Sequence, residues 1–185
     1  MVLYSVGKIE DLINIIIPHF KNYSLITQKG ADFILFEKIV KIMTKKEHLN
    51  IEGLSTIINI KSSMNLGLSD IIKSNFNNII PIDRPVIIAN NIPEPNWVSG
   101  FVTGEGNFDV RINQSKSIKK WYNVSLRFRI YQNERDIKLL ELLIKYLGRI
   151  EQSKNTRVAT LIITKISDIN NIIIPFFEKN PELNY

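Results

Sequence analysis

One acidic residue, Glu105, stands at the end of a segment whose pattern predicts a helix between Pro95 and Gly106. Apolar residues occupy one side of this helix and small residues the other: Trp97, Val98, Phe101 and Val102 against Ser99, Gly100, Thr103 and Gly104. Each glycine costs a helix about 1 kcal/mol relative to alanine, so we expect another backbone to pack against the small side. Asn96 is the predicted N-cap. The helix macrodipole disfavours a carboxylate at the C-terminus, so we expect a cation near Glu105.

Alternating apolar and polar residues follow over 108–113 and again over 121–131, which predicts an antiparallel hairpin with one core face and one polar, basic face. In the DNA major groove, Arg reads guanine and Asn reads adenine through paired hydrogen bonds. The candidates for base contacts are Arg111, Asn113, Asn123, Ser125, Arg127 and Arg129. The loop between the strands carries Lys116, Lys119 and Lys120, which suit phosphate contacts. The alternative is a polar face that meets only solvent.

An internal repeat organises the elements that position these residues. Residues 8–20 match residues 165–177 at a constant offset of 157, with 9 of 13 positions identical. Each copy follows a short apolar run, Val2 to Val6 or Leu161 to Thr164, so the repeated unit is predicted to be a strand, a turn and a helix that stops at proline. The chain is therefore predicted to be an internal duplication.

The remaining elements complete this organisation. Helical spacing over 31–44 and an N-cap at Asn50 ahead of 54–64 predict two covering helices, so residues 1–74 are assigned to the C-terminal part of a first copy. Prolines and asparagines remove all periodicity over 75–95, which predicts a linker. Asn133 is predicted to cap a helix over 134–147, with strands near 149–153 and 157–164. Residues 96–185 thus have the predicted order αββαββα and are assigned to a second copy that is truncated at its C-terminus. The predicted fold class is α+β, a duplicated fold with an antiparallel sheet, in which the first copy is incomplete.

Composition narrows the class of protein. The 185 residues are 44% hydrophobic and include no cysteine, which allows a folded core and excludes both disulfides and cysteine-based zinc sites. A net charge of +6 favours a polyanionic partner such as nucleic acid. The heavy use of Ile, Asn and Lys is typical of an AT-rich coding sequence, which hints at an organelle genome.

Residues 98–106, Val-Ser-Gly-Phe-Val-Thr-Gly-Glu-Gly, resemble the LAGLIDADG motif of homing endonucleases and intron maturases. The resemblance implies that two such helices pack through their small residues, and that an acidic residue ending each helix binds a divalent metal over the scissile phosphates. It makes Glu105 the metal ligand, with Mg²⁺ as the metal. Stretches at 28–33, 46–54 and 64–69 resemble the first domain of two-motif fungal mitochondrial members. The alternative is an ordinary amphipathic helix that ends in a glycine turn.

The same resemblance implies two further catalytic residues. Gln132, at the end of the second strand, would order the catalytic water, and Lys29, which opens the helix after the repeat, would stabilise charge. The alternatives are a strand-end polar residue and a surface lysine. A basic residue expected shortly after the glutamine is not clearly matched, because Asp136 stands there beside Arg135. Subtracting the offset, 98 − 157 = −59, places the first motif helix about 60 residues before Met1, so we expect a fragment that lacks it.

The implied function is Mg²⁺-dependent cleavage of a long, specific double-stranded DNA site by an intron-encoded mitochondrial protein. Cleavage by two acidic motifs implies that this chain alone is inactive and that its partner is the first-motif half, in cis or in trans. The alternative is a maturase that does not cleave DNA and binds its group I intron RNA through the same basic sheet.

Overall fold

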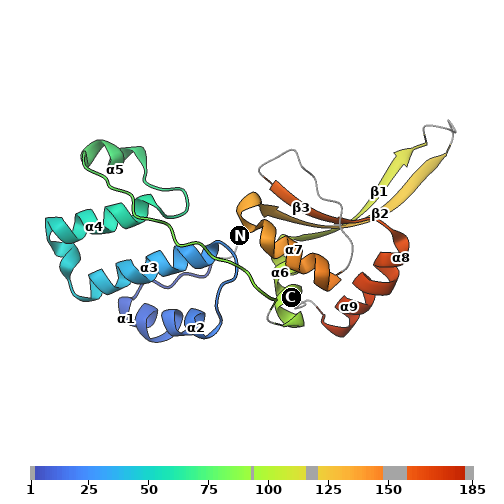
Figure 1. Cartoon of the computed structure of the whole chain (residues 1–185), viewed down its shortest axis with the longest axis horizontal. Coiled ribbons are helices and arrows are strands. Elements are labelled where there is room, and N and C mark those ends of the chain that lie inside the picture. Colours follow the sequence, from blue (N-terminus) through green and yellow to red (C-terminus); the bar gives the residue numbers. More distant parts are fainter. Residues whose placement is uncertain (1–2, 93, 116–120, 148–157, 182–185) are drawn as a thin grey trace. The chain divides into compact units, whose positions relative to one another are not determined.

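The computed structural model describes residues 3–92, 94–115, 121–147 and 158–181 (Figure 1). The chain divides into two compact units, Met1–Ile88 and Ala89–Tyr185. None of the helices in these described ranges is long and apolar enough to cross a membrane.

All the regular elements in the described part of the first unit are helical. Its elements are α1 (Ile9–Asp11), a π-helical turn (Leu12–Ile16), α2 (Ile17–Asn22), α3 (Lys29–Thr44), a 3₁₀ turn (Glu47–Leu49), α4 (Ile51–Ser62) and α5 (Asp70–Asn75). Leu12, Ile17 and Val40 form a buried cluster that joins the repeated helix to α3. The predicted cap of α4 is confirmed, because the Asn50 side chain accepts a hydrogen bond from the backbone N–H of Gly53 at 2.8 Å.

The predicted stop of the repeated helix at proline is wrong in both copies. Helical structure continues through Pro18 into α2, and through Pro175 into α9 (Ile174–Lys179). In each copy a π-helical turn precedes the proline, and the residue before the proline donates its N–H five residues back, from Ile17 to Leu12 and from Ile174 to Ile169. This wider turn accommodates the missing proline N–H and the pyrrolidine ring without ending the helix.

The predicted strand over Val2 to Val6 is also wrong. Residues 3–8 have no helix or strand, and the described part of the first unit contains no strand at all. Because a β-strand is stabilised by hydrogen bonds to a neighbouring strand, an apolar run without such a neighbour does not adopt one.

Residues 79–88, here called the strap, lie within the predicted linker but are held to the first unit by hydrogen bonds. The guanidinium of Arg84 is the centre of this attachment. It donates to the Asp32 carboxylate at 2.6 Å, to the carbonyl of Ser63 at 2.9 Å and to the carbonyl of Gln28 at 3.0 Å. Gln28 in turn donates from its side chain to the carbonyl of Ile87 at 3.1 Å. The strap therefore closes over α3 and the end of α4.

We expect Arg84→Met to lower the free energy of unfolding of the first unit by about 2 to 3 kcal/mol, because a mostly buried carboxylate and two carbonyls lose a charged donor.

The hydrogen bond from Arg84 lowers the pKa of Asp32 and outweighs the opposing effect of burial. A lowered folded-state pKa stabilises the protein above the unfolded value, and this contribution is lost as pH falls through the folded pKa. Urea unfolding of wild type and Asp32→Asn should therefore differ at neutral pH and converge below the ordinary aspartate pKa of 3.8. The control for Arg84→Met is Arg135→Met, which removes an exposed arginine. Equal losses for Arg84→Met and Arg135→Met would contradict the role given to the strap.

The second unit combines a three-stranded antiparallel sheet with helices (Figure 1). Its elements are α6 (Pro95–Glu105), β1 (Gly106–Gln114), β2 (Tyr122–Asn133), a 3₁₀ turn (Glu134–Asp136), α7 (Ile137–Leu147), β3 (Val158–Ile163), α8 (Ile166–Asp168), a π-helical turn (Ile169–Ile173) and α9. The sheet order is β1-β2-β3. The predicted cap at Asn133 is confirmed, because its side chain accepts a hydrogen bond from the backbone N–H of Arg135 at 3.1 Å. The predicted α+β class is confirmed. The strand predicted near 149–153 lies outside the described residues.

Only the base of β2, the central strand of the sheet, has the predicted core face. Phe128 and Ile130 are buried, whereas Phe108 and Val110 are 55% and 61% exposed although they share the same face. Ile112, Tyr122 and Val124, farther along the hairpin, are exposed as well. None of the described helices covers this outer half, so the alternation of residue types overstates how much of the face is core.

Candidate nucleic-acid interface and acidic helix end

The predicted base-reading residues lie on one face of the hairpin. The register pairs Asn113 with Asn123, Arg111 with Ser125 and Asp109 with Arg127. Directly paired residues share a face, and side chains two apart along a strand return to it. The six candidates therefore form a continuous polar surface of β1 and β2. Lys116, Lys119 and Lys120, the predicted phosphate contacts, lie outside the described residues.

Asp109 neutralises part of this face. Arg127 donates from Nε to Oδ1 of Asp109 at 2.8 Å and from Nη2 to Oδ2 at 2.6 Å, while Arg129 also donates to Oδ2. Arg129 further donates to the Asn107 side chain at 2.9 Å, and its guanidinium lies 5.4 Å from the centre of the Tyr131 ring. Both arginines thus have fixed orientations on the sheet, which reduces the conformational entropy that they lose when they meet a ligand.

The electrostatics of the cluster follow from this geometry. The hydrogen bond from Arg127 lowers the pKa of Asp109, and the charges of Arg127 and Arg129 act in the same direction. The Asp109 carboxylate raises the pKa of Arg127. The cluster is therefore ionised at neutral pH with one net positive charge, and Arg111, which donates to the Asn113 side chain at 3.1 Å, adds another to the face.

Asn107, Asp109 and Tyr131 also belong to this polar face, although the types of these residues alone do not mark them. Asp109 is one of the polar positions in the alternation over 108–113. Once the hairpin is recognised, pairing of 109 with 127 follows from its register, and a carboxylate opposite an arginine is a stabilising cross-strand pair. The register is therefore the signal that identifies this cluster.

Helix α6 carries Glu105 as its last residue, and Glu105 is exposed. The predicted N-cap is wrong, because Glu94 occupies the cap position and Pro95 lies in the first turn, ahead of Asn96. No residue of the described ranges forms an ion pair with Glu105, so the expected compensating cation is not found among them. This end of the helix therefore presents a carboxylate, just before β1, that no described residue neutralises.

The small side of α6 differs from the prediction at one position. Ser99 is buried, and its hydroxyl donates to the carbonyl of Asn180 at 2.7 Å, so it belongs to the packed side with Val98 and Val102. The buried side of α6 is therefore one residue wider than its apolar side, because it includes Ser99.

The rest of the small side is open. Apart from its chain neighbours and the backbone of its own helix, a methyl group added at Gly100 or Gly104 would meet no described atom within 4 Å, and Thr103 is exposed. Trp97 and Phe101 stack at 4.9 Å and are half-buried, so they border the small residues rather than forming core. The result is a flat helix face flanked by an aromatic pair.

The predicted catalytic residues fall in different units. Gly106 pairs with Ile130, so Glu105, just before β1, and Gln132, near the end of β2, lie at the same end of the β1–β2 ladder. The Gln132 side chain is half-buried on the face of Phe128 and Ile130, and not on the base-reading face. Lys29 belongs to the first unit, where it is the exposed first residue of α3.

The described residues do not form a ready-made metal cage. They contain no group of three or more His, Cys, Asp or Glu side chains that could hold an ion. Mg²⁺ is commonly bound by one or two carboxylates together with substrate phosphates. The exposed carboxylate of Glu105 fits one ligand of such a site, with the others supplied by the nucleic acid and by a second acidic residue.

Known proteins match this arrangement closely. A family model described as LAGLIDADG endonuclease matches residues 1–40 and 98–184. Probable intron-encoded endonuclease 3 of Neurospora crassa is 49% identical over 184 residues, which cover 98% of this chain and 34% of that protein. The meganuclease I-CpaMI bound to uncleaved DNA superposes with a TM-score of 0.91 at 37% identity, over 97% of this chain and 62% of that one. I-SmaMI bound to an uncleaved DNA target in the presence of calcium ions gives 0.90 at 41% identity, over 97% and 62%.

The chain thus spans about a third of the curated relative and less than two thirds of the solved ones. The family model covers the repeated helix and the first part of α3 in the first unit, and it covers residues 98–184 of the second unit. The resemblance carried by residues 98–106 is confirmed by this match, by the relative in Neurospora crassa and by the superposed meganucleases. This chain belongs to the LAGLIDADG endonuclease family.

Proposed function

We propose that the chain binds a specific site in double-stranded DNA through the polar face of β1 and β2, as part of a homing endonuclease that cleaves both strands. The observation that carries the proposal is the continuous polar face beside the carboxylate that ends α6. A two-stranded β-ribbon fits the major groove, where arginine and asparagine side chains distinguish base pairs. The meganucleases that superpose on this chain were solved with DNA.

Cleavage requires more than this chain supplies. Glu105 is one metal ligand in the proposal, and a second acidic helix end is needed to complete the site. The open face of Gly100, Thr103 and Gly104 is where the other motif helix would pack, because two backbones approach closely only where side chains are small. A bound Mg²⁺ would stabilise the charge that develops on the attacking and leaving oxygens of the phosphodiester. We therefore expect the chain alone to bind DNA without cutting it.

Gln132 and Lys29 keep their proposed roles, in ordering water and in stabilising charge. Gln132 is supported by its position at the Glu105 end of the ladder. Lys29 is supported by its exposure at the first residue of α3. A mitochondrial location is proposed from the Ile-, Asn- and Lys-rich composition and from the intron-encoded relative in a fungus.

The test is binding of the chain to duplexes selected from a randomised DNA library, measured over a salt series. The logarithm of affinity should fall linearly with the logarithm of salt, by about 0.9 per phosphate contact. Asp109→Asn releases Arg127 and Arg129, so nonspecific affinity should rise, the salt slope should steepen by about 1 to 2, and the preference for the selected duplex should fall. Asp70→Asn changes the net charge equally on an exposed residue of the first unit and is the control.

Two results would contradict this proposal. If Asp109→Asn and Asp70→Asn shift the salt slope equally, DNA does not meet the hairpin face. If group I intron RNA binds and duplex DNA cannot displace it, the non-cleaving maturase function is favoured. Side chains cannot read the deep, narrow major groove of A-form RNA, so we expect DNA to displace the RNA.

A further inference from the structure

Arg127 and Arg129 are neighbours on the polar face of β1 and β2 and both bind Asp109, but they use different N–H groups to do so. A guanidinium has a side fork, formed by Nε and Nη2, and an end fork, formed by Nη1 and Nη2. Each fork can donate two parallel hydrogen bonds to one ligand. The fork that remains free therefore decides whether each arginine can still bind a base through a pair of hydrogen bonds.

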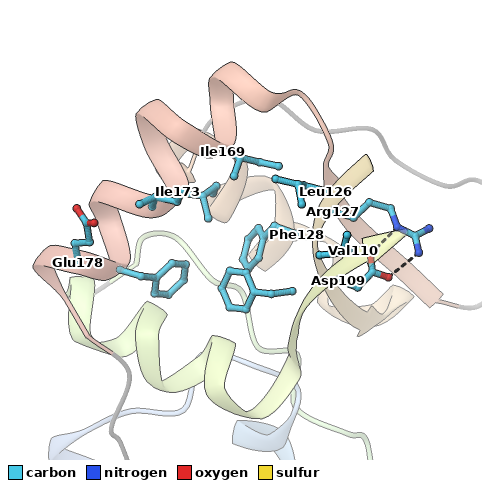
Figure 2. A pocket seen from close by; sticks show the side chains of 11 residues that line it. Asp109, Val110, Leu126, Arg127, Phe128, Ile169, Ile173 and Glu178 are labelled. Atoms are coloured by element: carbon cyan, nitrogen blue, oxygen red, sulfur yellow. Dashed lines mark hydrogen bonds and ion pairs between the residues drawn. The ribbon is translucent and has the colours of Figure 1, made fainter. Parts of the chain in front are cut away.

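Arg127 keeps its end fork. It donates from Nε to Oδ1 of Asp109 at 2.8 Å and from Nη2 to Oδ2 at 2.6 Å, and Figure 2 shows its guanidinium beside this carboxylate. These two bonds use only the side fork. No other residue of the described ranges accepts a hydrogen bond from Arg127, and 24% of the surface of its side chain is exposed. Its end fork is therefore available to a ligand, in an orientation that Asp109 fixes.

Arg129 keeps neither fork. Its Nη2 donates to Oδ2 of Asp109 and, at 2.9 Å, to Oδ1 of Asn107, so both hydrogens of this nitrogen are occupied. Because Nη2 belongs to both forks, neither fork can donate a pair of hydrogen bonds to a further ligand. The Nε atom of Arg129 is buried and has no acceptor among the described residues. Arg129 thus offers a ligand only Nη1, and it contacts the carboxylate that holds Arg127.

The free fork of Arg127 matches guanine among the four bases. In the major groove, guanine presents two neighbouring acceptors, O6 and N7, and arginine can donate to both at once. Adenine presents an acceptor beside a donor, thymine a single acceptor, and cytosine a donor. None of these three bases can therefore accept both hydrogens of the fork.

A backbone phosphate is the other part of DNA that could accept two parallel hydrogen bonds from an arginine. The position of Arg127 favours a base. It lies on β2, the central strand, between Ser125 and Arg129 along the same face and opposite Asp109 on β1. It is therefore surrounded by polar side chains of this face rather than placed at its border.

We propose that, of these two arginines, Arg127 reads a guanine through Nη1 and Nη2, whereas Asp109 and Arg129 are positioning residues that hold its guanidinium. The inference rests on the proposed binding of double-stranded DNA, and it names the arginine that determines sequence preference. Arg129, which the sequence pattern also marks as a base reader, has a supporting role.

The test replaces each guanine of the duplex selected from the randomised library, one at a time, with 7-deazaguanine, which lacks the N7 acceptor but still pairs with cytosine. Binding of the whole chain should weaken by about tenfold at the guanine that Arg127 reads, because one hydrogen bond of the pair is lost. Arg127→Met should remove the sensitivity at that guanine and keep it at any other sensitive guanine. Methionine keeps the aliphatic stem of the side chain, and circular dichroism and the melting temperature check the fold.

Arg129→Met is the matched control, because it makes the same substitution and the same change of charge two residues away on the same face. It leaves both hydrogen bonds between Arg127 and Asp109 in place, so most of the sensitivity at the guanine should remain. Asp109→Asn keeps only one of the two carboxylate acceptors that fix the side fork. It should therefore reduce the sensitivity at this guanine more than Arg129→Met does, and leave the other guanines unchanged.

Three results would overturn this assignment while DNA binding by the chain still stands. They are a selected duplex in which no guanine is sensitive, an equal loss of affinity for all duplexes in Arg127→Met with every sensitivity retained, and loss of the sensitivity in Arg129→Met but not in Arg127→Met. The second result would identify Arg127 as a phosphate contact. Failure to select any duplex would contradict the proposed function itself, and this assignment with it.

Discussion

In a protein that carries a first motif helix ahead of this chain, we expect Glu105→Gln to reduce the rate of DNA cleavage at least ~1000-fold. Glutamine keeps the size of the side chain but removes the negative charge that would hold a divalent cation. Loss of several kcal/mol of metal-dependent stabilisation of the transition state corresponds to a rate change of at least ~1000-fold. Single-turnover cleavage of the selected duplex in Mg²⁺ gives this rate directly.

The same substitution should leave DNA binding without metal unchanged. It should also leave the fold as stable as wild type or slightly more stable, because an unpaired anion at a helix C-terminus costs about 0.3 to 1 kcal/mol. Glu94→Gln is the matched control, since Glu94 is exposed at the opposite end of the same helix. Cleavage by Glu105→Gln at the wild-type rate would remove this residue from the reaction.

Local patterns predicted most of the elements. The helix over 31–44 and the caps at Asn50 and Asn133 are present because period and capping depend on residues a few positions apart. The two copies of the internal repeat share a π-helical turn before proline. The π-helical turn itself was not predicted, because a proline within a helical pattern normally marks the end of the helix. The spacing of the apolar residues does not show that one wider turn accommodates the proline.

Burial could not be predicted from the same patterns. Phe108 and Phe128 are paired residues on one sheet face, yet one is 55% exposed and the other is buried, because Phe108 lies on the edge strand β1 and Phe128 on the central strand β2. Ser99 is buried because the carbonyl of Asn180, 81 residues away, accepts its hydroxyl. Such contacts depend on which distant segments meet, and a helical wheel or an alternating strand does not contain that information.

Gly100 lies on the same helix as Glu105, and its substitution tests how the helix packs, independently of the proposed metal ligand. In this chain alone, Gly100→Leu should raise the free energy of unfolding of the second unit by about 0.5 to 1 kcal/mol, because leucine is a better helix former than glycine. Apart from the chain neighbours of Gly100 and the backbone of its own helix, no described atom lies within 4 Å of the Cβ that leucine would add. In the protein with a first motif helix restored, the same leucine should prevent the two helices from packing, because a bulky side chain cannot fit where backbones nearly touch. Cleavage and cooperative unfolding of the paired helices should then both be lost.

Gly106→Ala is the control for a glycine that this chain itself requires. A methyl group at that position would lie 2.5 Å from a side-chain carbon of Val102 and 2.6 Å from its carbonyl oxygen. We therefore expect Gly106→Ala to destabilise the chain alone by about 1 to 3 kcal/mol, the cost of overpacking. Thermal melting of the two variants should shift in opposite directions. If Gly100→Leu instead lowers the melting temperature of this chain alone, part of the chain already covers the small face. If it leaves the restored protein able to cleave DNA, the two motif helices do not meet at Gly100.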